Sequence, residues 1–222
     1  MNYDRGYRVR LHTLNTGSRN IKTKRNRKRG FPILKSPILV FITVIFASIA
    51  NAHQPILNGE GLTSPETAYV IDKPEISKAI FSQLNGMPQY YRIDSETDFA
   101  FYVGLTQPKR GTCPIASTFS FDVLDPHLHV IDGRDGESFE WWEWYEEYGK
   151  DWYWVGPEVG KEFKSDRIYK AGTYYVRVFN NDNQGQYVLA VGDIEKFTLP
   201  VIARTILTMP KINSKFWADK LC

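Results

Sequence analysis

The sequence lacks the motifs that identify several common classes of enzyme and of nucleic-acid-binding protein. It contains no G-x-S-x-G elbow, no H-E-x-x-H helix and no glycine-rich phosphate loop. Residues 53–222 also lack an excess of basic side chains, since they hold 17 basic and 24 acidic residues, a net charge of −7. A nucleic-acid-binding domain needs the opposite sign to displace counterions from phosphates. We therefore expect no nucleic-acid partner, and catalysis has little support.

Cysteine is also scarce. The chain contains only Cys113, in a loop-like stretch, and Cys222, its last residue. An oxidising compartment would permit a disulfide between them, but two cysteines do not establish a pair. The sequence leaves both alternatives open.

The first 52 residues differ from the rest in charge and hydropathy. They carry 11 basic residues and one acidic residue, Asp4, and their uncharged stretch 36–50 has the length of a signal-peptide core. That stretch is short for a bilayer span, which needs about 20 apolar residues. The small residues Ala50 and Ala52 predict cleavage after Ala52 and export to the periplasm or the cell exterior. The alternative is an uncleaved membrane anchor.

Residues 67–192 predict an all-β domain, an antiparallel, jelly-roll-like β-sandwich, after an extended arm at 53–66 that is rich in glycine and proline. Apolar side chains alternate with others along Phe99–Val103, which places one face of a strand in a core. Turn dipeptides such as Asn85-Gly86 and Asp132-Gly133 separate most runs. Nine runs rich in aromatic and β-branched residues are expected strands: 68–71, 78–84, 89–93, 99–105, 118–124, 128–131, 152–155, 174–179 and 186–191.

Residues 193–222 predict a short helical tail. The run 201–209 follows Pro200, which is tolerated in a first helical turn, and we expect the helix to end before Pro210. The helix either packs on the sandwich or lies on a membrane surface. In the second case the residues at the interface would be Lys211, Lys215, Phe216 and Trp217.

Two strand patterns resemble the bacterial pre-peptidase C-terminal-like domains. The first is QYYRI at 89–93 with the following FAFYVGL, and the second is AGTYYVRV at 171–178 with GQYVLAV at 185–191. The resemblance covers residues 67–192 and implies an exported jelly-roll-type sandwich of the kind used as an accessory module. It implies no particular function. The sequence departs from the family's usual setting, because it contains no catalytic domain for such a module to serve.

The most unusual segment is 139–154, FEWWEWYEEYGKDWYW, which holds five of the six tryptophans. Aromatic rings beside carboxylates suit sugar faces, cationic ligands or protein hot spots. The alternative is a packed loop that closes one end of the sandwich. A small sandwich has little room for five buried tryptophans, so we expect at least one of Trp141, Trp142 and Trp144 to be exposed. The candidate binding residues are Trp141, Trp142, Glu143, Trp144, Tyr145 and Glu146.

Two groups of residues are candidates for metal binding. Asp132, Asp135 and Glu137 lie on a glycine-containing loop, where oxygen ligands could hold calcium or could form an ordinary turn. His53, His127 and His129 are the histidines that remain after cleavage, and nitrogen ligands suit copper. No cofactor is assured by either pattern.

These observations favour an exported, non-enzymatic binding module whose tryptophan-rich segment contacts an envelope protein or a glycan. Peripheral or anchored membrane association is compatible with the leader and the tail. The first alternative is a periplasmic metal-binding protein, with structural calcium or with copper. The second is a hydrolase of envelope polymers, because neighbouring carboxylates such as Glu146 and Glu147 are available.

Overall fold

The computed structural model of the protein describes residues 53–58, 61–147 and 149–217. The predicted leader, the predicted cleavage site after Ala52 and Cys222 lie outside the described residues. The strands are β1 (Gln54–Leu57), β2 (Tyr69–Ile71), β3 (Lys78–Asn85), β4 (Gln89–Ser95), β5 (Phe99–Ala100), β6 (Val103–Pro108), β7 (Ser120–Leu124), β8 (Val130–Arg134), β9 (Trp142–Glu146), β10 (Asp151–Val159), β11 (Ile168–Tyr169), β12 (Gly172–Phe179) and β13 (Gln184–Val191). The helices are the 3-10 turn η1 (Pro65–Thr67) and α2 (Leu199–Phe216).

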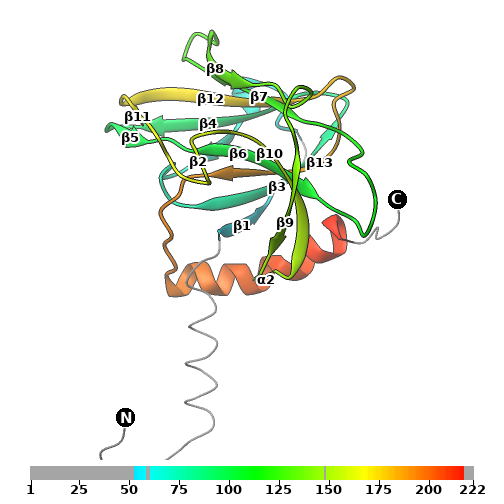
Figure 1. Ribbon diagram of the computed structural model, residues 1–222. Helices are drawn as coiled ribbons and strands as arrows, with labels where there is room; N and C mark the ends of the chain where they lie inside the picture. Colours follow the sequence, from blue (N-terminus) through cyan, green and yellow to red (C-terminus); the bar gives the residue numbers. More distant parts are fainter. Residues whose placement is uncertain (1–52, 59–60, 148, 218–222) are drawn as a thin grey trace, which may run out of the picture.

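Two large sheets pack face to face, which confirms the all-β sandwich predicted from the sequence (Figure 1). One sheet has six strands in the order β1-β3-β13-β6-β10-β9, and the other has five in the order β2-β4-β12-β7-β8. Strands β5 and β11 form a small third sheet. Most neighbours are antiparallel, but β1 pairs in parallel with β3 and β2 in parallel with β4. The two strands that follow the leader therefore each join the edge of a different sheet.

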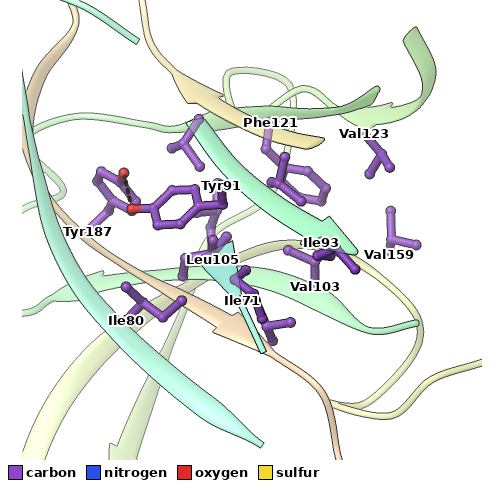
Figure 2. Packing of buried hydrophobic residues seen from close by; sticks show 14 of the residues in the cluster. Ile71, Ile80, Tyr91, Ile93, Val103, Leu105, Phe121, Val123, Val159 and Tyr187 are labelled. Carbon is purple, nitrogen blue, oxygen red and sulfur yellow. Dashed lines mark hydrogen bonds between the residues drawn. The ribbon is translucent and has the colours of Figure 1, made fainter. Parts of the chain in front are cut away.

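The main core lies between the two large sheets and takes side chains from both (Figure 2). The alternating residues Phe99 and Phe101 are buried, as predicted, although Tyr102 beside them is buried too. Two tyrosines also point into this core: the hydroxyls of Tyr91 and Tyr187 are 2.7 Å apart, and Tyr187 donates to Gln89 Oε1 at 2.7 Å. Burial raises the pKa of both tyrosines. The hydroxyls are thus neutral donors inside an otherwise apolar interior.

Helix α2 packs on the outer face of the six-stranded sheet, which is the first of the two alternatives that the sequence left open (Figure 1). The predicted end before Pro210 is wrong, because the helix continues to Phe216. Proline costs an interior helix about 3 kcal/mol, but Ile212 and Phe216 beyond it are almost fully buried and offset that cost. Among the described residues, no helix has the length and apolar character needed to cross a membrane.

Three local predictions differ from the structure. Residues 54–57 of the expected arm form strand β1, which is covered by α2. The run 99–105 is divided into β5, which pairs with β11, and β6, which pairs with β10 and β13. Asp132-Gly133 is not a turn but part of β8, where Asp132 and Gly133 pair with Val123 and Asp122 of β7.

Candidate functional site

The tryptophan-rich segment is a β-hairpin at one edge of the six-stranded sheet, formed by β9 and β10 (Figure 1). Trp152 lies opposite Tyr145, and Tyr153 lies opposite Trp144. Because successive side chains of a strand point to opposite faces, these two cross-strand pairs lie on opposite faces of the hairpin. The two faces have different surroundings and must be considered separately.

The face that carries Trp144 and Tyr153 is largely structural. The Trp144 ring lies 6.1 Å from Tyr153 and 5.4 Å from Phe163, and Tyr153 lies 5.3 Å from Trp217. Tyr153 is buried, and burial raises its pKa strongly. These rings form a second apolar cluster with Ile212 and Phe216 of α2. These rings therefore pack the hairpin against the helix, and they are not available to contact a ligand.

Trp141 is also a packing residue. It contacts the main core, and its Nε1 donates to Gly136 O at 2.8 Å. Its ring lies directly over Gly156, where an added Cβ atom would overlap the ring. A glycine at position 156 is therefore required for the close approach of this tryptophan. Trp141 holds the start of the hairpin against the sandwich.

The face turned away from α2 exposes aromatic rings to solvent. Tyr145 and Trp152 are 40% and 46% exposed, and their ring centroids are 5.2 Å apart. The Lys109 ammonium lies 5.7 Å from the Trp152 ring and 5.6 Å from the Trp154 ring, and 3.4 Å from Glu143. We call the group Lys109, Glu143, Tyr145, Trp152 and Trp154 the aromatic platform. The cation and carboxylate fix the position of rings that the core does not hold.

A cleft of about 500 Å³ adjoins the platform and shares Trp154 with it. Its other lining residues include Gln83, Gln107, Arg110, Cys113 and Gln186. Arg110 donates from Nη2 to Gln186 Oε1 at 2.5 Å, whereas its buried Nε has no hydrogen-bond partner. Cys113 is disulfide-bonded. The chain's one other cysteine, Cys222, lies outside the described residues. Cys113 lies in the loop that forms one wall of the cleft, so the disulfide restrains that wall.

The six candidate binding residues therefore lie in four different settings. Glu143 and Tyr145 belong to the platform, whereas Trp141 and Trp144 are partly buried packing residues. Trp142 is 44% exposed, as the sequence predicts for at least one of three tryptophans, but its ring lies 6.1 Å from Phe163 on the face opposite the platform. In the hairpin turn, Glu146 Oε2 accepts a hydrogen bond from Gly149 N at 2.5 Å.

Sequence analysis missed three platform residues, Lys109, Trp152 and Trp154. The last two could have been found by treating the segment as a hairpin with a turn near Gly149, because that register places Trp152 beside Tyr145. Lys109 has no such signal. It follows β6, and only the pairing of β6 with β10 brings it to the tryptophans.

The three calcium candidates are bonded to other protein groups. Asp132 accepts from Arg134 Nη1 at 2.5 Å and from Arg167 Nη1 at 2.7 Å. Asp135 accepts from Ser138 Oγ at 2.7 Å and from Glu137 N at 3.0 Å, and these bonds lower the pKa of its carboxyl. The Glu137 side chain accepts from the Asn181 amide. Each carboxylate thus has a partner of its own.

The three histidines lie in two places. His127 and His129 are exposed in the β7–β8 connection, with rings 6.1 Å apart, and His129 Nδ1 lies 3.2 Å from Asp125 Oδ2. His53 precedes β1, where burial and the charge of Lys164 lower its pKa to about 4. Across residues 53–58, 61–147 and 149–217, no three His, Cys, Asp or Glu side chains are grouped so that they could hold a metal ion.

The chain matches no model of a known protein family and no curated protein sequence. Its function must therefore be argued from the platform and the cleft themselves.

Proposed function

We propose that the protein is an exported, non-enzymatic module that binds carbohydrate at the aromatic platform and the adjoining cleft. The observation that carries the proposal is the position of Trp154, which belongs both to the platform and to the wall of the cleft. A chain of sugar units could therefore contact exposed rings at one end and polar side chains at the other.

The exposed pair Tyr145 and Trp152 has the chemistry that sugars require. A pyranose ring has an apolar face of C–H groups, and aromatic rings bury that face while their edges stay wet. Leaving two large rings in water forfeits apolar burial that a core position would have given them. Their exposure is consistent with a surface that is covered when a ligand binds.

Polar groups around the rings can bond sugar hydroxyls. Glu143 offers carboxylate oxygens at the platform, and its side chain is 48% exposed. In the cleft, the exposed side-chain amide of Gln83 offers both a donor and an acceptor to sugar hydroxyls. A few polar groups along a concave surface are typical of ligand sites.

Export rests on the basic leader, the uncharged stretch 36–50 and the small residues before His53. The resemblance to pre-peptidase C-terminal-like domains supports the same compartment and the same kind of accessory role. The compartment matters for the ligand, because polysaccharides of the cell envelope lie outside the cytoplasm.

The experiment compares two tryptophans that are exposed to the same extent on opposite faces of the hairpin. Trp152, in the platform, is 46% exposed, and Trp142, outside it, is 44% exposed. The protein is titrated by calorimetry with a panel of envelope oligosaccharides. For a sugar that binds, Trp152→Ala should weaken binding at least about tenfold, which is 1.4 kcal/mol. Trp142→Ala should leave it unchanged. Equal effects of the two substitutions, or no binding to any sugar in the panel, would contradict the proposal.

One observation favours a protein partner as the second candidate. Strand β9 ends the six-stranded sheet, so one of its edges pairs with no described strand. An extended segment of another protein could add there as a further strand, with Trp142 as an anchor. In that case Trp142→Ala would weaken the protein complex, while sugars would have no effect on either variant.

A further inference from the structure

Helix α2 has an apolar face that does not contact the sandwich. Its buried side carries Ile212 and Phe216, and both are almost fully covered. On the solvent side, Leu199, Ile206 and Leu207 are 72%, 66% and 71% exposed. No other large apolar side chain among the described residues is as exposed as these three. The helix therefore packs with one side and presents a second apolar surface to solvent.

The exposed apolar residues form one continuous stripe. Each of Leu199, Ala203, Ile206, Leu207 and Pro210 has another member of the set three or four positions away, which is the spacing of one helix face. We call these five residues the apolar stripe of α2. A row of large side chains on one face, unlike scattered surface leucines, marks a contact surface.

The charges on α2 are all of one sign and lie beside this stripe. Arg204, Lys211 and Lys215 are exposed, and their spacings of seven and four positions align them along the helix. The segment 199–216 contains no acidic residue, although residues 53–222 as a whole have a net charge of −7. The helix is thus a basic and apolar surface on an acidic domain. A basic and apolar surface of this kind is complementary to a partner whose outermost layer is negatively charged and whose interior is apolar.

The position of α2 fits the same kind of partner. The helix contacts β1, and β1 begins at Gln54, four residues after the uncharged stretch 36–50 ends. At the bottom of Figure 1, α2 lies on the side of the sandwich opposite β8. Helix α2 thus lies against the strand at the N-terminal end of the described domain.

We propose that α2 lies flat on a lipid bilayer that contains anionic phospholipids. The apolar stripe enters the boundary between headgroups and acyl chains, and Arg204, Lys211 and Lys215 contact headgroup phosphates. This differs from the interface expected from the sequence, because Phe216 and Trp217 pack against the sandwich instead. A second copy of the chain is a poorer occupant, since a symmetric contact through α2 would bring two rows of basic residues close together.

The test uses the full chain, reconstituted in vesicles of phosphatidylcholine with or without phosphatidylglycerol. A photoreactive benzoylphenylalanine replaces Leu207 in the apolar stripe or, as the matched control, Ile131 of β8, which is also exposed. The two proteins differ only in the labelled position, so a difference in adducts reports what that position contacts. After illumination, mass spectrometry identifies the molecule to which the photoreactive side chain at each position has become crosslinked. Equal melting temperatures show that the two variants fold alike.

The proposal expects lipid adducts at position 207, several-fold more than at position 131. It also expects their yield to fall when phosphatidylglycerol is omitted or when Arg204, Lys211 and Lys215 are replaced by Gln, about fivefold for each charge near the surface. Equal lipid yields at the two positions would overturn the proposal. Crosslinked dimers at position 207 would overturn it in favour of a second copy, and no adduct at all would show that this face stays in water.

Discussion

The two apolar clusters of the molecule differ in composition and in what surrounds them. The inner cluster fills the space between the sheets with 18 buried residues and includes the bonded pair Tyr91 and Tyr187. The outer cluster has five buried residues, of which Ile212 and Phe216 belong to α2, and its partly buried partners include Trp144 and Trp217. Every candidate surface, the platform and the apolar stripe alike, adjoins the outer cluster or its hairpin. The two proposed binding surfaces thus lie mainly beside the outer cluster, although the cleft also reaches Phe119 of the inner one.

The largest effect is expected from a truncation in the inner cluster. Phe121→Ala leaves a cavity between two sheets that cannot close around it, so it should lower the free energy of unfolding by about 3–5 kcal/mol. Urea denaturation followed by circular dichroism gives this value. The exposed control Ile131→Ala should change stability by no more than about 0.5 kcal/mol. A small effect of Phe121→Ala would mean that the sheets are loosely packed.

A matching truncation in the outer cluster should lower the free energy of unfolding by a smaller amount. Phe216 lies at the end of α2, and the helix can settle into the space that Phe216→Ala leaves, so we expect a loss of about 2–3 kcal/mol. The same denaturation experiment measures it. If the loss equals that of Phe121→Ala, the two clusters form one cooperative core and the comparison fails.

The attachment of the hairpin to the sandwich can be tested at Gly156. Gly156→Ala places a methyl group in the ring of Trp141, and overpacking of this kind costs about 1–3 kcal/mol. The overlap disappears if Trp141 is also removed. The double variant Gly156→Ala with Trp141→Ala should therefore be less destabilised than the sum of the two single changes. Strict additivity in a double-mutant cycle would show that the ring does not lie over Gly156.

A charged group at the start of β3 should make stability depend on pH. Lys78 donates to the carbonyl oxygens of Lys73 and Ile76 at 2.7 and 2.9 Å, and burial lowers its pKa from 10.5 to about 8. Between these two values the unfolded chain binds more protons than the folded one, so stability should rise as the pH increases through that window. Thermal unfolding at several pH values tests this, and Lys78→Met should remove that rise.

The smallest effect on stability is expected in the platform. Trp152 is 46% exposed, and Trp152→Ala should change the free energy of unfolding by less than about 1 kcal/mol while it weakens sugar binding. A loss of about 3 kcal/mol or more would assign Trp152 to the packed structure. Parallel measurements of binding and stability on one preparation distinguish these outcomes.

Much of the fold could be predicted from the sequence, because alternation reports directly on which face of a strand is buried. Phe99, Phe101 and Val103 are examples, and all three are buried as expected. Predictions from short sequence patterns were wrong where contacts with residues distant in the sequence determine the local structure. Asp132-Gly133 has the composition of a turn, but the bonds of Asp132 to Arg134 and Arg167 stabilise it within β8.

The candidate site was less accessible to sequence reasoning. The tryptophans of segment 139–154 mark it as a candidate site. They do not show which of its rings are packed and which are exposed. That division depends on the register of β9 with β10 and on the helix that covers one face of the hairpin. Lys109 could not be selected at all, because its distance to the tryptophans is set by the pairing of β6 with β10.

The parallel pairing of β1 with β3 has a mechanical consequence. A load that enters the domain at His53 passes first into β1, whose register matches Gln54 to Lys78 and Leu57 to Phe81. Tension along that strand is shared by all its hydrogen bonds to β3 at once, whereas tension across it would break them one after another. The same strand lies under α2, so it cannot slide without disturbing the helix. The first strand of the domain is thus built to resist a pull along its own axis.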